Sequence, residues 1–164
     1  MTASKGSGPR PDDAPGPVVG EPFELDRDQC LAFLRSVRVG RVVLPGAGPG
    51  PLAVLPVNFV VDGDQVVLRT GAGSILAAAQ AGAVVTFQAD AFDEADGGRG
   101  WSVTVAGRAR EATGPMLHRI AGLPLRPIAG GVREHFVLIH IETTDGRRVG
   151  APVRVRAPDG LPTR

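Results

Sequence analysis

The sequence predicts a mainly β domain: a small closed antiparallel barrel of six strands, with a helix before it and short helices inserted in it. Three observations lead to this fold class. The chain has 164 residues, of which 43% are hydrophobic and 21% charged, a composition typical of one globular domain. Six segments are rich in the β-branched and apolar residues that strands favour, and in residues 101–110 these alternate with polar residues at a period of two. Tight turns and short helical segments separate them.

The first element is a helix over residues 26–36. Asp26 can accept a hydrogen bond from the backbone of Gln29, and the Gln29 side chain can reach back, which is the pattern of a capping box. The apolar residues recur at helical spacing and predict a buried stripe of Cys30, Leu31, Leu34 and Val37. We therefore interpret the single cysteine as a small core residue rather than a nucleophile.

The next three strands are expected over residues 39–44, 52–61 and 65–70. An Asp-Gly-Asp sequence at 62–64 predicts a tight hairpin turn between the second and the third of them. After the third strand, Ser74 can cap a short helix over residues 75–81, which Gly82 ends.

Three further strands are expected over residues 83–90, 101–110 and 133–144. In the middle one the alternation predicts a buried face made of Trp101, Val103, Val105 and Ala109. Gly107 interrupts this strand at a place that suits a bulge or the close approach of another segment. A helix over residues 115–122 begins with a proline, and residues 123–131 are irregular.

The ends of the chain differ from its middle. Residues 1–22 and 151–164 are interpreted as flexible tails, which leaves one domain over residues 23–150. A formal net charge of +1 does not favour nucleic acid, and no apolar run approaches the roughly 20 residues of a membrane span. With one cysteine and no apolar leader at the N-terminus, the sequence predicts a protein of the reducing cytoplasm.

The strongest candidate ligand site is the sequence RTGAGS at 69–74, where a strand turns through glycines into the start of a helix. Free N–H groups of a first helical turn favour an anion such as phosphate. Arg69 and the hydroxyls of Thr70 and Ser74 would complete such a site. A plain turn followed by a helix cap explains the same residues, and the sequence leaves both interpretations open.

A second candidate is the strand segment LPVN at 55–58. Pro56 removes a backbone donor, which indicates an edge or an irregular stretch whose neighbouring backbone groups can face a ligand. A barrel strand with an edge proline explains it equally well. The histidines His118, His135 and His140 lack metal-ligand spacing, so we predict no metal site, and no residue is assigned as catalytic.

Four stretches resemble the pyridoxamine 5′-phosphate oxidase-like family of FMN-binding split barrels. They are LAFLRSVRVGR at 31–41, LPVNFVVDGDQVVLRTGAGSIL at 55–76, GWSVTVAGRARE at 100–111 and RPIAGGVREHFVLIHIETTDGRRV at 126–149. The resemblance covers residues 25–149 and implies a split β-barrel. It also implies a homodimer that binds FMN at the subunit interface.

The resemblance further implies which residues contact the cofactor. The 69–74 turn would hold the phosphate, the 54–58 strand would line the isoalloxazine ring, and the tryptophan would lie near the mouth of the site. The implied cofactor-binding residues are Val54, Leu55, Pro56, Val57, Asn58, Arg69, Thr70, Ser74, Ile75 and Trp101.

One of these residues departs from the family pattern. Members of the family often carry Lys or Arg where this chain has Ile75, and losing a direct cation costs roughly 1.5–3 kcal/mol of binding free energy. Arg69, Arg108 or Arg110 could supply the missing charge. Ile128 likewise stands where the family often has Trp.

The function implied by the resemblance is that of an FMN-dependent oxidoreductase acting on a small organic substrate. Two alternatives stay open. One is a non-catalytic binding or sensing protein that has lost its flavin, with Ile75 as the trace of that loss. The other is a reductase that uses a deazaflavin cofactor.

Overall fold

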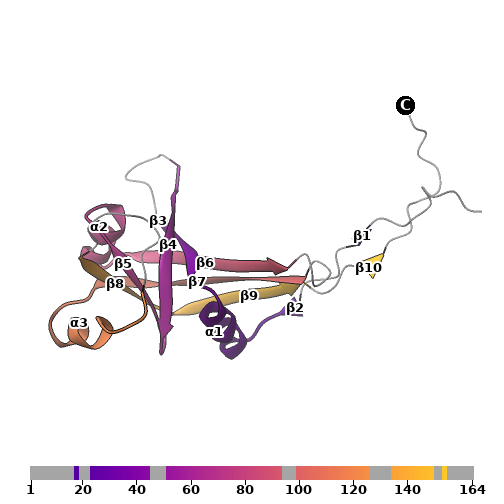
Figure 1. The fold of residues 1–164 in the computed structure, drawn as a ribbon. Coiled ribbons are helices and arrows are strands. Elements are labelled where there is room, and N and C mark those ends of the chain that lie inside the picture. The colour runs from indigo at the N-terminus through magenta and orange to yellow at the C-terminus, as the bar shows by residue number, and fades with distance from the viewer. Residues whose placement is uncertain are drawn as a thin grey trace, which may run out of the picture.

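The structure is a computed structural model, and it describes residues 23–44, 51–93, 99–125 and 134–149 together with the backbone of 17–18 and 153–154. Figure 1 shows the arrangement of its elements. In chain order they are β1 (Pro17–Val18), β2 (Phe23–Glu24), α1 (Arg27–Ser36), β3 (Val39–Leu44), β4 (Ala53–Asp62), β5 (Gln65–Thr70), α2 (Ser74–Gln80), β6 (Val84–Asp93), β7 (Arg99–Glu111), α3 (Gly114–Ile120), β8 (His135–His140), β9 (Thr143–Val149) and β10 (Val153–Arg154).

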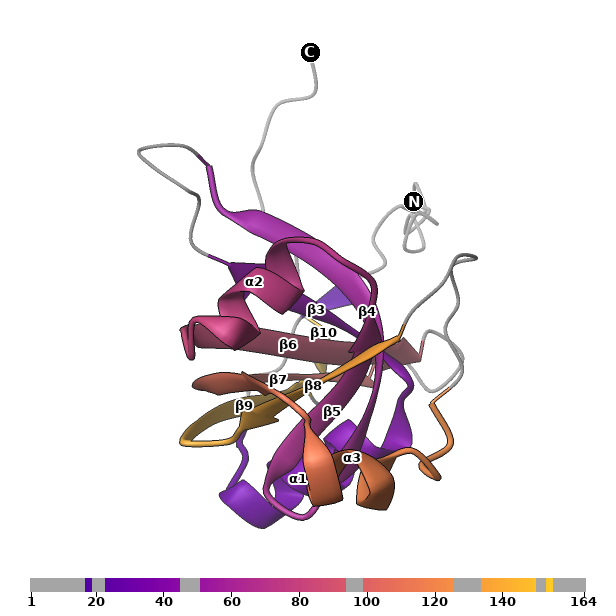
Figure 2. The same ribbon diagram turned by 90° about the vertical axis from the view of Figure 1, so that its left-hand side faces the viewer.

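Six antiparallel strands close into a barrel. Around the ring, β3 pairs with β4, β4 with β5, β5 with β8, β8 with β7, β7 with β6, and β6 again with β3. β9 and β2 extend the sheet beyond β7. In Figure 2, α2 lies above the ring and α1 and α3 lie below it. The predicted six-stranded antiparallel barrel is therefore confirmed.

β7 holds the two halves of this sheet together. Its first part pairs with β6 and β9, and residues Ala109 to Glu111 pair with β8. Between the two parts lies Gly107, where an added Cβ would overlap the carbonyl oxygen of His140. The close approach predicted at this glycine is confirmed, because no side chain fits between the two backbones.

The last predicted strand, over residues 133–144, is wrong as a single element. β8 ends at His140 and β9 begins at Thr143. Between them, the Ile141 N–H donates to the carbonyl of Asp64 (N···O 2.9 Å) and the Glu142 N–H donates to the carbonyl of Ala106 (3.0 Å). Ile141 is buried and continues the apolar alternation, so the sequence pattern carries no sign that the strand changes partners here.

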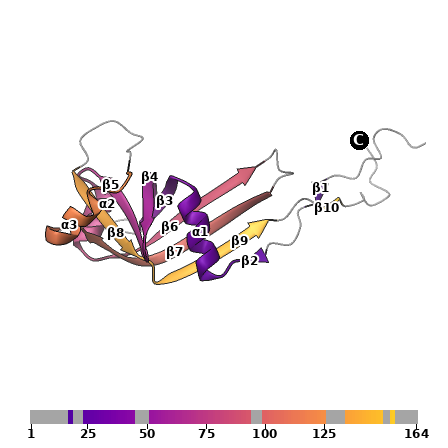
Figure 3. The same cartoon turned by 60° about the horizontal axis from the view of Figure 1, so that its bottom comes forward.

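Helix α1 begins as its sequence predicts. Asp26 accepts from the Gln29 N–H at 2.8 Å, and the Asp26 N–H donates to the Gln29 side chain at 3.0 Å. Cys30, Leu31 and Leu34 are buried, and α1 packs against β4, β7 and β9 (Figure 3). Cys30 is fully buried, and burial raises the pKa of its thiol, which is consistent with a core residue.

Two apolar clusters form the core. The barrel interior contains Phe59 and Phe87 in an edge-to-face contact at 4.7 Å between ring centroids. It also takes the predicted face of β7, which is buried at Trp101, Val103, Val105 and Ala109. The second cluster lies between α3 and the outside of β5 and β8, with Ile120, Val67, Phe136 and Leu138 among its members. β5 and β8 are therefore buried on both faces.

The predicted tails 1–22 and 151–164 lie outside the described residues, apart from β1 and β10, whose backbones pair in antiparallel fashion. Residues 45–50 and the segment 126–133, which contains Ile128, also lie outside them. Among the helices that the structure describes, none is long and apolar enough to span a membrane.

Candidate functional site

The turn between β5 and α2 is open to solvent at its glycine. Gly73 has a φ of +155°, which favours glycine, and a Cβ placed there would meet no atom of the described residues within 4 Å. Gly73 is also the N-cap of α2, and no side chain caps the helix. The prediction that Ser74 caps this helix is wrong, because Ser74 is its exposed first residue. Uncapped N–H groups therefore face the open side of the turn.

The side chains around this turn point in different directions. Arg69 lies over the ring of Phe136, 5.0 Å from its centroid, on the outside of β5. Thr70, the next residue, is buried, and its hydroxyl donates to the carbonyl of Gly71 at 3.1 Å. Ile75 belongs to the barrel core. Of the residues predicted to bind an anion, only Ser74 therefore lies at the open turn, beside the first N–H groups of α2.

Arg108 and Arg110 do not supply a cation at this turn. The Arg108 guanidinium donates to the carbonyl of Gly82 at 2.7 Å, beyond the C-terminal end of α2. A seven-residue helix is about 10 Å long, so Arg108 lies about that far from the first turn. Arg110 is two residues further along β7, opposite Leu138. Neither arginine therefore lies at the start of α2.

On the side of β4 that faces away from β3, residues 53–57 pair with no strand that the structure describes. This segment pairs with β3 on one side, and pairing with β5 on the other side begins only at Phe59. The predicted edge position of Pro56 is thus confirmed. Leu55 and Val57 pack toward the core, while Val54 is 55% exposed and Pro56 is exposed. The Asn58 side chain donates to the carbonyl of Arg38 at 3.1 Å and so fastens β4 to the segment after α1.

A polar network lies beside Val54 and Pro56, on the solvent-facing side of β3 and β4. Pro56 pairs with Arg41 of β3, which in turn pairs with Gln88 of β6. The Arg41 guanidinium donates to the Gln88 side-chain oxygen at 3.1 Å and to an Asp90 carboxylate oxygen at 2.7 Å. We call the surface formed by Val39, Arg41, Val54 and Pro56 the outer β3–β4 face. The period-two polar positions of β3 and β6 were the signal for Arg41, Gln88 and Asp90, which our sequence reasoning missed.

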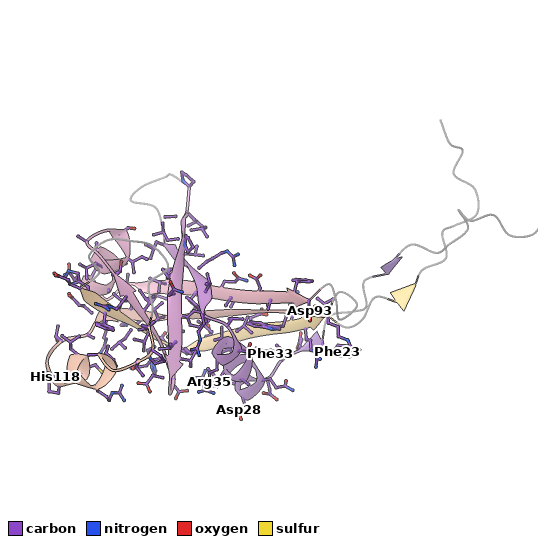
Figure 4. All side chains as sticks on the ribbon, viewed as in Figure 1. Phe23, Asp28, Phe33, Arg35, Asp93 and His118 are labelled. Atoms are coloured by element: carbon purple, nitrogen blue, oxygen red, sulfur yellow. The ribbon has the colours of Figure 1, made fainter. Side chains whose placement is uncertain are left out.

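Trp101 lies on the other side of the sheet. It is 8% exposed, and its ring packs against Phe33 of α1 at 5.1 Å between centroids. Figure 4 shows Phe33 on α1. Trp101 pairs with Ala91, whereas the outer β3–β4 face continues into β6 at Gln88. Within one chain, Trp101 therefore anchors α1 and does not reach the outer β3–β4 face.

A hydrogen-bonded Glu111–His135 pair lies at the other end of α2. His135 contacts a carboxylate oxygen of Glu111 at 2.7 Å, and the Gln80 amide donates to the other oxygen at 2.9 Å. These hydrogen bonds, from Gln80 first and His135 second, lower the pKa of Glu111 below its ordinary value.

His118 is exposed on α3 (Figure 4). In the part of the chain that the structure describes, no three His, Cys, Asp or Glu side chains are placed to hold a metal ion.

Comparison with known proteins identifies relatives of this chain. A Mycobacterium tuberculosis protein described as uncharacterized, Rv0080, is 36% identical over 140 residues, which are 82% of this chain and 90% of that protein. The solved FAD binding protein from Mycobacterium smegmatis is 32% identical, with a TM-score of 0.64, over 76% of this chain and 96% of that one.

A second solved structure, a conserved protein of unknown function from Corynebacterium diphtheriae, is 29% identical with a TM-score of 0.63, over 80% of this chain and 98% of that one. The family described as pyridoxamine 5′-phosphate oxidase matches residues 26–148, which include every barrel strand. This match confirms the resemblance seen in the sequence, and the chain belongs to the pyridoxamine 5′-phosphate oxidase family.

Proposed function

We propose that the protein binds a flavin nucleotide at the outer β3–β4 face and acts as an oxidoreductase on a small organic substrate. The observation that carries this proposal is the 32% identity to the FAD binding protein from Mycobacterium smegmatis, over 96% of that chain. A bound flavin supplies the centre that accepts and donates electrons, while the protein binds and orients it.

The outer β3–β4 face suits the ring system of a flavin, which is a flat apolar body with polar groups along one edge. Val54 and Pro56 present apolar surface to solvent. The adjoining edge of β4 offers backbone N–H and C=O groups that pair with no other described strand. The chain can therefore bind such a ring through backbone groups, with no charged side chain required.

The start of α2 suits the phosphate. Its first N–H groups are uncapped, and the Ser74 hydroxyl is exposed beside them. Neither Arg69, which lies over Phe136, nor Arg108 is placed at this turn. We therefore expect flavin binding to be about one to two orders of magnitude weaker than it would be with a lysine in place of Ile75.

The proposal includes a homodimer with the cofactor at its interface. Val39 and Val54 are 43% and 55% exposed at the two ends of the outer β3–β4 face, and exposed apolar side chains on such a face favour a protein partner. Val54→Asp should shift the dimer toward monomer in sedimentation velocity. Thr113→Asp, at an exposed position before α3, should leave the dimer intact.

The test of flavin binding is a titration of FMN and, separately, FAD with purified protein, followed by quenching of flavin fluorescence. Family resemblance implies FMN, and the Mycobacterium smegmatis protein is described as FAD binding, so the two titrations decide between these nucleotides. Saturable binding of either supports the proposal. No binding of either would favour the alternative of a binding or sensing protein without flavin. Binding of a deazaflavin alone would favour the deazaflavin-dependent reductase.

We further propose that the protein works in the cytoplasm. The support for this is chemical: its single cysteine, Cys30, is buried and unpaired, as is usual for proteins of reducing compartments. Fractionation of cells that produce the protein tests this expectation, and its recovery outside the cytoplasmic fraction would contradict it.

A further inference from the structure

A cavity of about 400 Å³ lies on another side of the barrel, between β5, β7, β8 and helix α3. This volume is within the range of small-molecule sites, about 300–1,000 Å³. Gln65, at the first position of β5, lines the cavity, whereas the turn described above follows Thr70 at the other end of β5. Five residues of strand span about 16 Å, so the cavity is separate from the start of α2.

Two arginines give the cavity its charge. Arg108 and Arg110 are alternate residues of β7, so their side chains share one face of the strand, and both line the cavity. Arg108 uses one guanidinium donor on the carbonyl of Gly82 and keeps the others. Arg110 makes no side-chain hydrogen bond or ion pair with any described residue. Its guanidinium is therefore available to an anion.

The cavity holds one carboxylate beside these arginines. Glu142 lines it and accepts the backbone N–H of Arg108 at 3.2 Å. Two guanidinium groups and one carboxylate leave one positive charge to balance. The planar guanidinium group of Arg110 can bind a carboxylate through two parallel hydrogen bonds.

One residue of the cavity wall also carries an unpaired acceptor. The side-chain oxygen of Gln65 is buried and has no hydrogen-bond partner among the described residues. Such an oxygen is unfavourable unless a donor reaches it. On the other side, Met116 of α3 and Leu138 of β8 provide apolar lining. The walls therefore offer a cationic group, an acceptor and an apolar surface.

We propose that this cavity binds a small organic acid that carries a hydroxyl or amino group beside an apolar body. The carboxylate pairs with Arg110 and the free donors of Arg108. The Gln65 side chain turns its buried oxygen toward the cavity and accepts from the hydroxyl or amino group, and the apolar body packs on Met116 and Leu138. Nothing in this proposal depends on flavin binding.

Three probes separate these contacts in calorimetric titrations of the full chain. Phenyllactate has the carboxylate, the hydroxyl and an apolar ring. Hydrocinnamate lacks the hydroxyl, and phenylpropanediol lacks the carboxylate. We expect phenyllactate to bind with a Kd below about 1 mM and each of the other two to bind about tenfold more weakly.

Variants assign the contacts to residues. Arg110→Gln should weaken phenyllactate binding about tenfold. Arg147→Gln is the matched control, because it removes the same charge from an exposed position of β9. Gln65→Met should bring phenyllactate down to the affinity of hydrocinnamate and leave hydrocinnamate within about twofold. Because this change removes an unpaired buried oxygen, it should not lower the thermal midpoint, which also shows that the variant folds.

Several results would overturn the proposal. Phenyllactate that produces no binding heat at about 10 mM, far above the expected Kd, excludes this ligand class. Equal affinity for phenyllactate and phenylpropanediol excludes the carboxylate contact. An equal effect of Arg110→Gln and Arg147→Gln shows that the effect is one of overall charge rather than of this cavity.

Discussion

Replacing Ile75 by lysine tests whether the start of α2 holds the phosphate of a flavin. Ile75 is 9% exposed and belongs to the barrel core. Burial of such a side chain stabilises a protein by about 1.5–3 kcal/mol, and the methylenes of lysine can cover part of the same surface. We therefore expect Ile75→Lys to lower the free energy of unfolding by about 1–2 kcal/mol.

The same change should strengthen flavin binding. A lysine at this core position whose long chain extends its ammonium to the first turn of α2 adds a charge-assisted hydrogen bond to the phosphate, which is worth about 1.5–3 kcal/mol. The dissociation constant of FMN or FAD should fall roughly tenfold to a hundredfold. Urea unfolding measures the stability change, and quenching of flavin fluorescence measures the affinity.

Ile75→Gln is the matched control, since glutamine brings polarity into the same core position without a charge. It should lose at least as much stability as the lysine variant and gain no more than about twofold in affinity, because neutral hydrogen bonds are weaker than charged ones. If Ile75→Lys and Ile75→Gln bind flavin equally, the phosphate does not lie at the start of α2.

Three further predictions concern the fold. Gly107→Ala should destabilise the protein by about 2–4 kcal/mol in urea unfolding, because the new Cβ would overlap the His140 carbonyl. Gly122→Ala is the control: its new Cβ would meet no atom of the described residues within 4 Å, so stability should change by less than about 0.5 kcal/mol. Similar effects of the two changes would contradict the close contact of β7 with β8. The lowered pKa of Glu111 means that its contacts stabilise the fold above the ordinary pKa of 4.5 and that this contribution is lost as pH falls through the lower, folded value. The stability difference between wild type and Glu111→Gln should therefore shrink in acid, and a difference that grows in acid would reverse this sign. Phe33→Ala should shift the emission of the only tryptophan, Trp101, to longer wavelength by admitting water beside its ring, and unchanged emission would show that α1 does not shield it.

The barrel was predictable because its strands follow simple patterns. Val39–Leu44 and Gln65–Thr70 match their predicted bounds, since each is rich in β-branched and apolar residues and ends at turn residues. The same pattern could not reveal the break after His140. Ile141 stays buried while its neighbours change partners, and a change of partner leaves no mark on a period of two.

The candidate site was only partly predictable. Pro56 marked the half-paired edge of β4, because a missing donor limits where a strand can pair. The separation of Arg69 from Thr70 follows from the alternation of side chains along β5, but which face carries the ligand depends on how the barrel closes. The cavity beside Arg110 brings together residues of β5, β7, β8 and α3, and no local motif indicates such a set.

The most direct test of the central claim is a flavin titration of the wild-type protein beside Val54→Glu, which places a charge on the outer β3–β4 face at a residue that is already 55% exposed. The account predicts saturable flavin quenching by the wild type and at least a tenfold loss of affinity in the variant, whose circular dichroism should remain that of the folded protein. Equal binding by both proteins, or no binding by the wild type, would contradict a flavin site on this face.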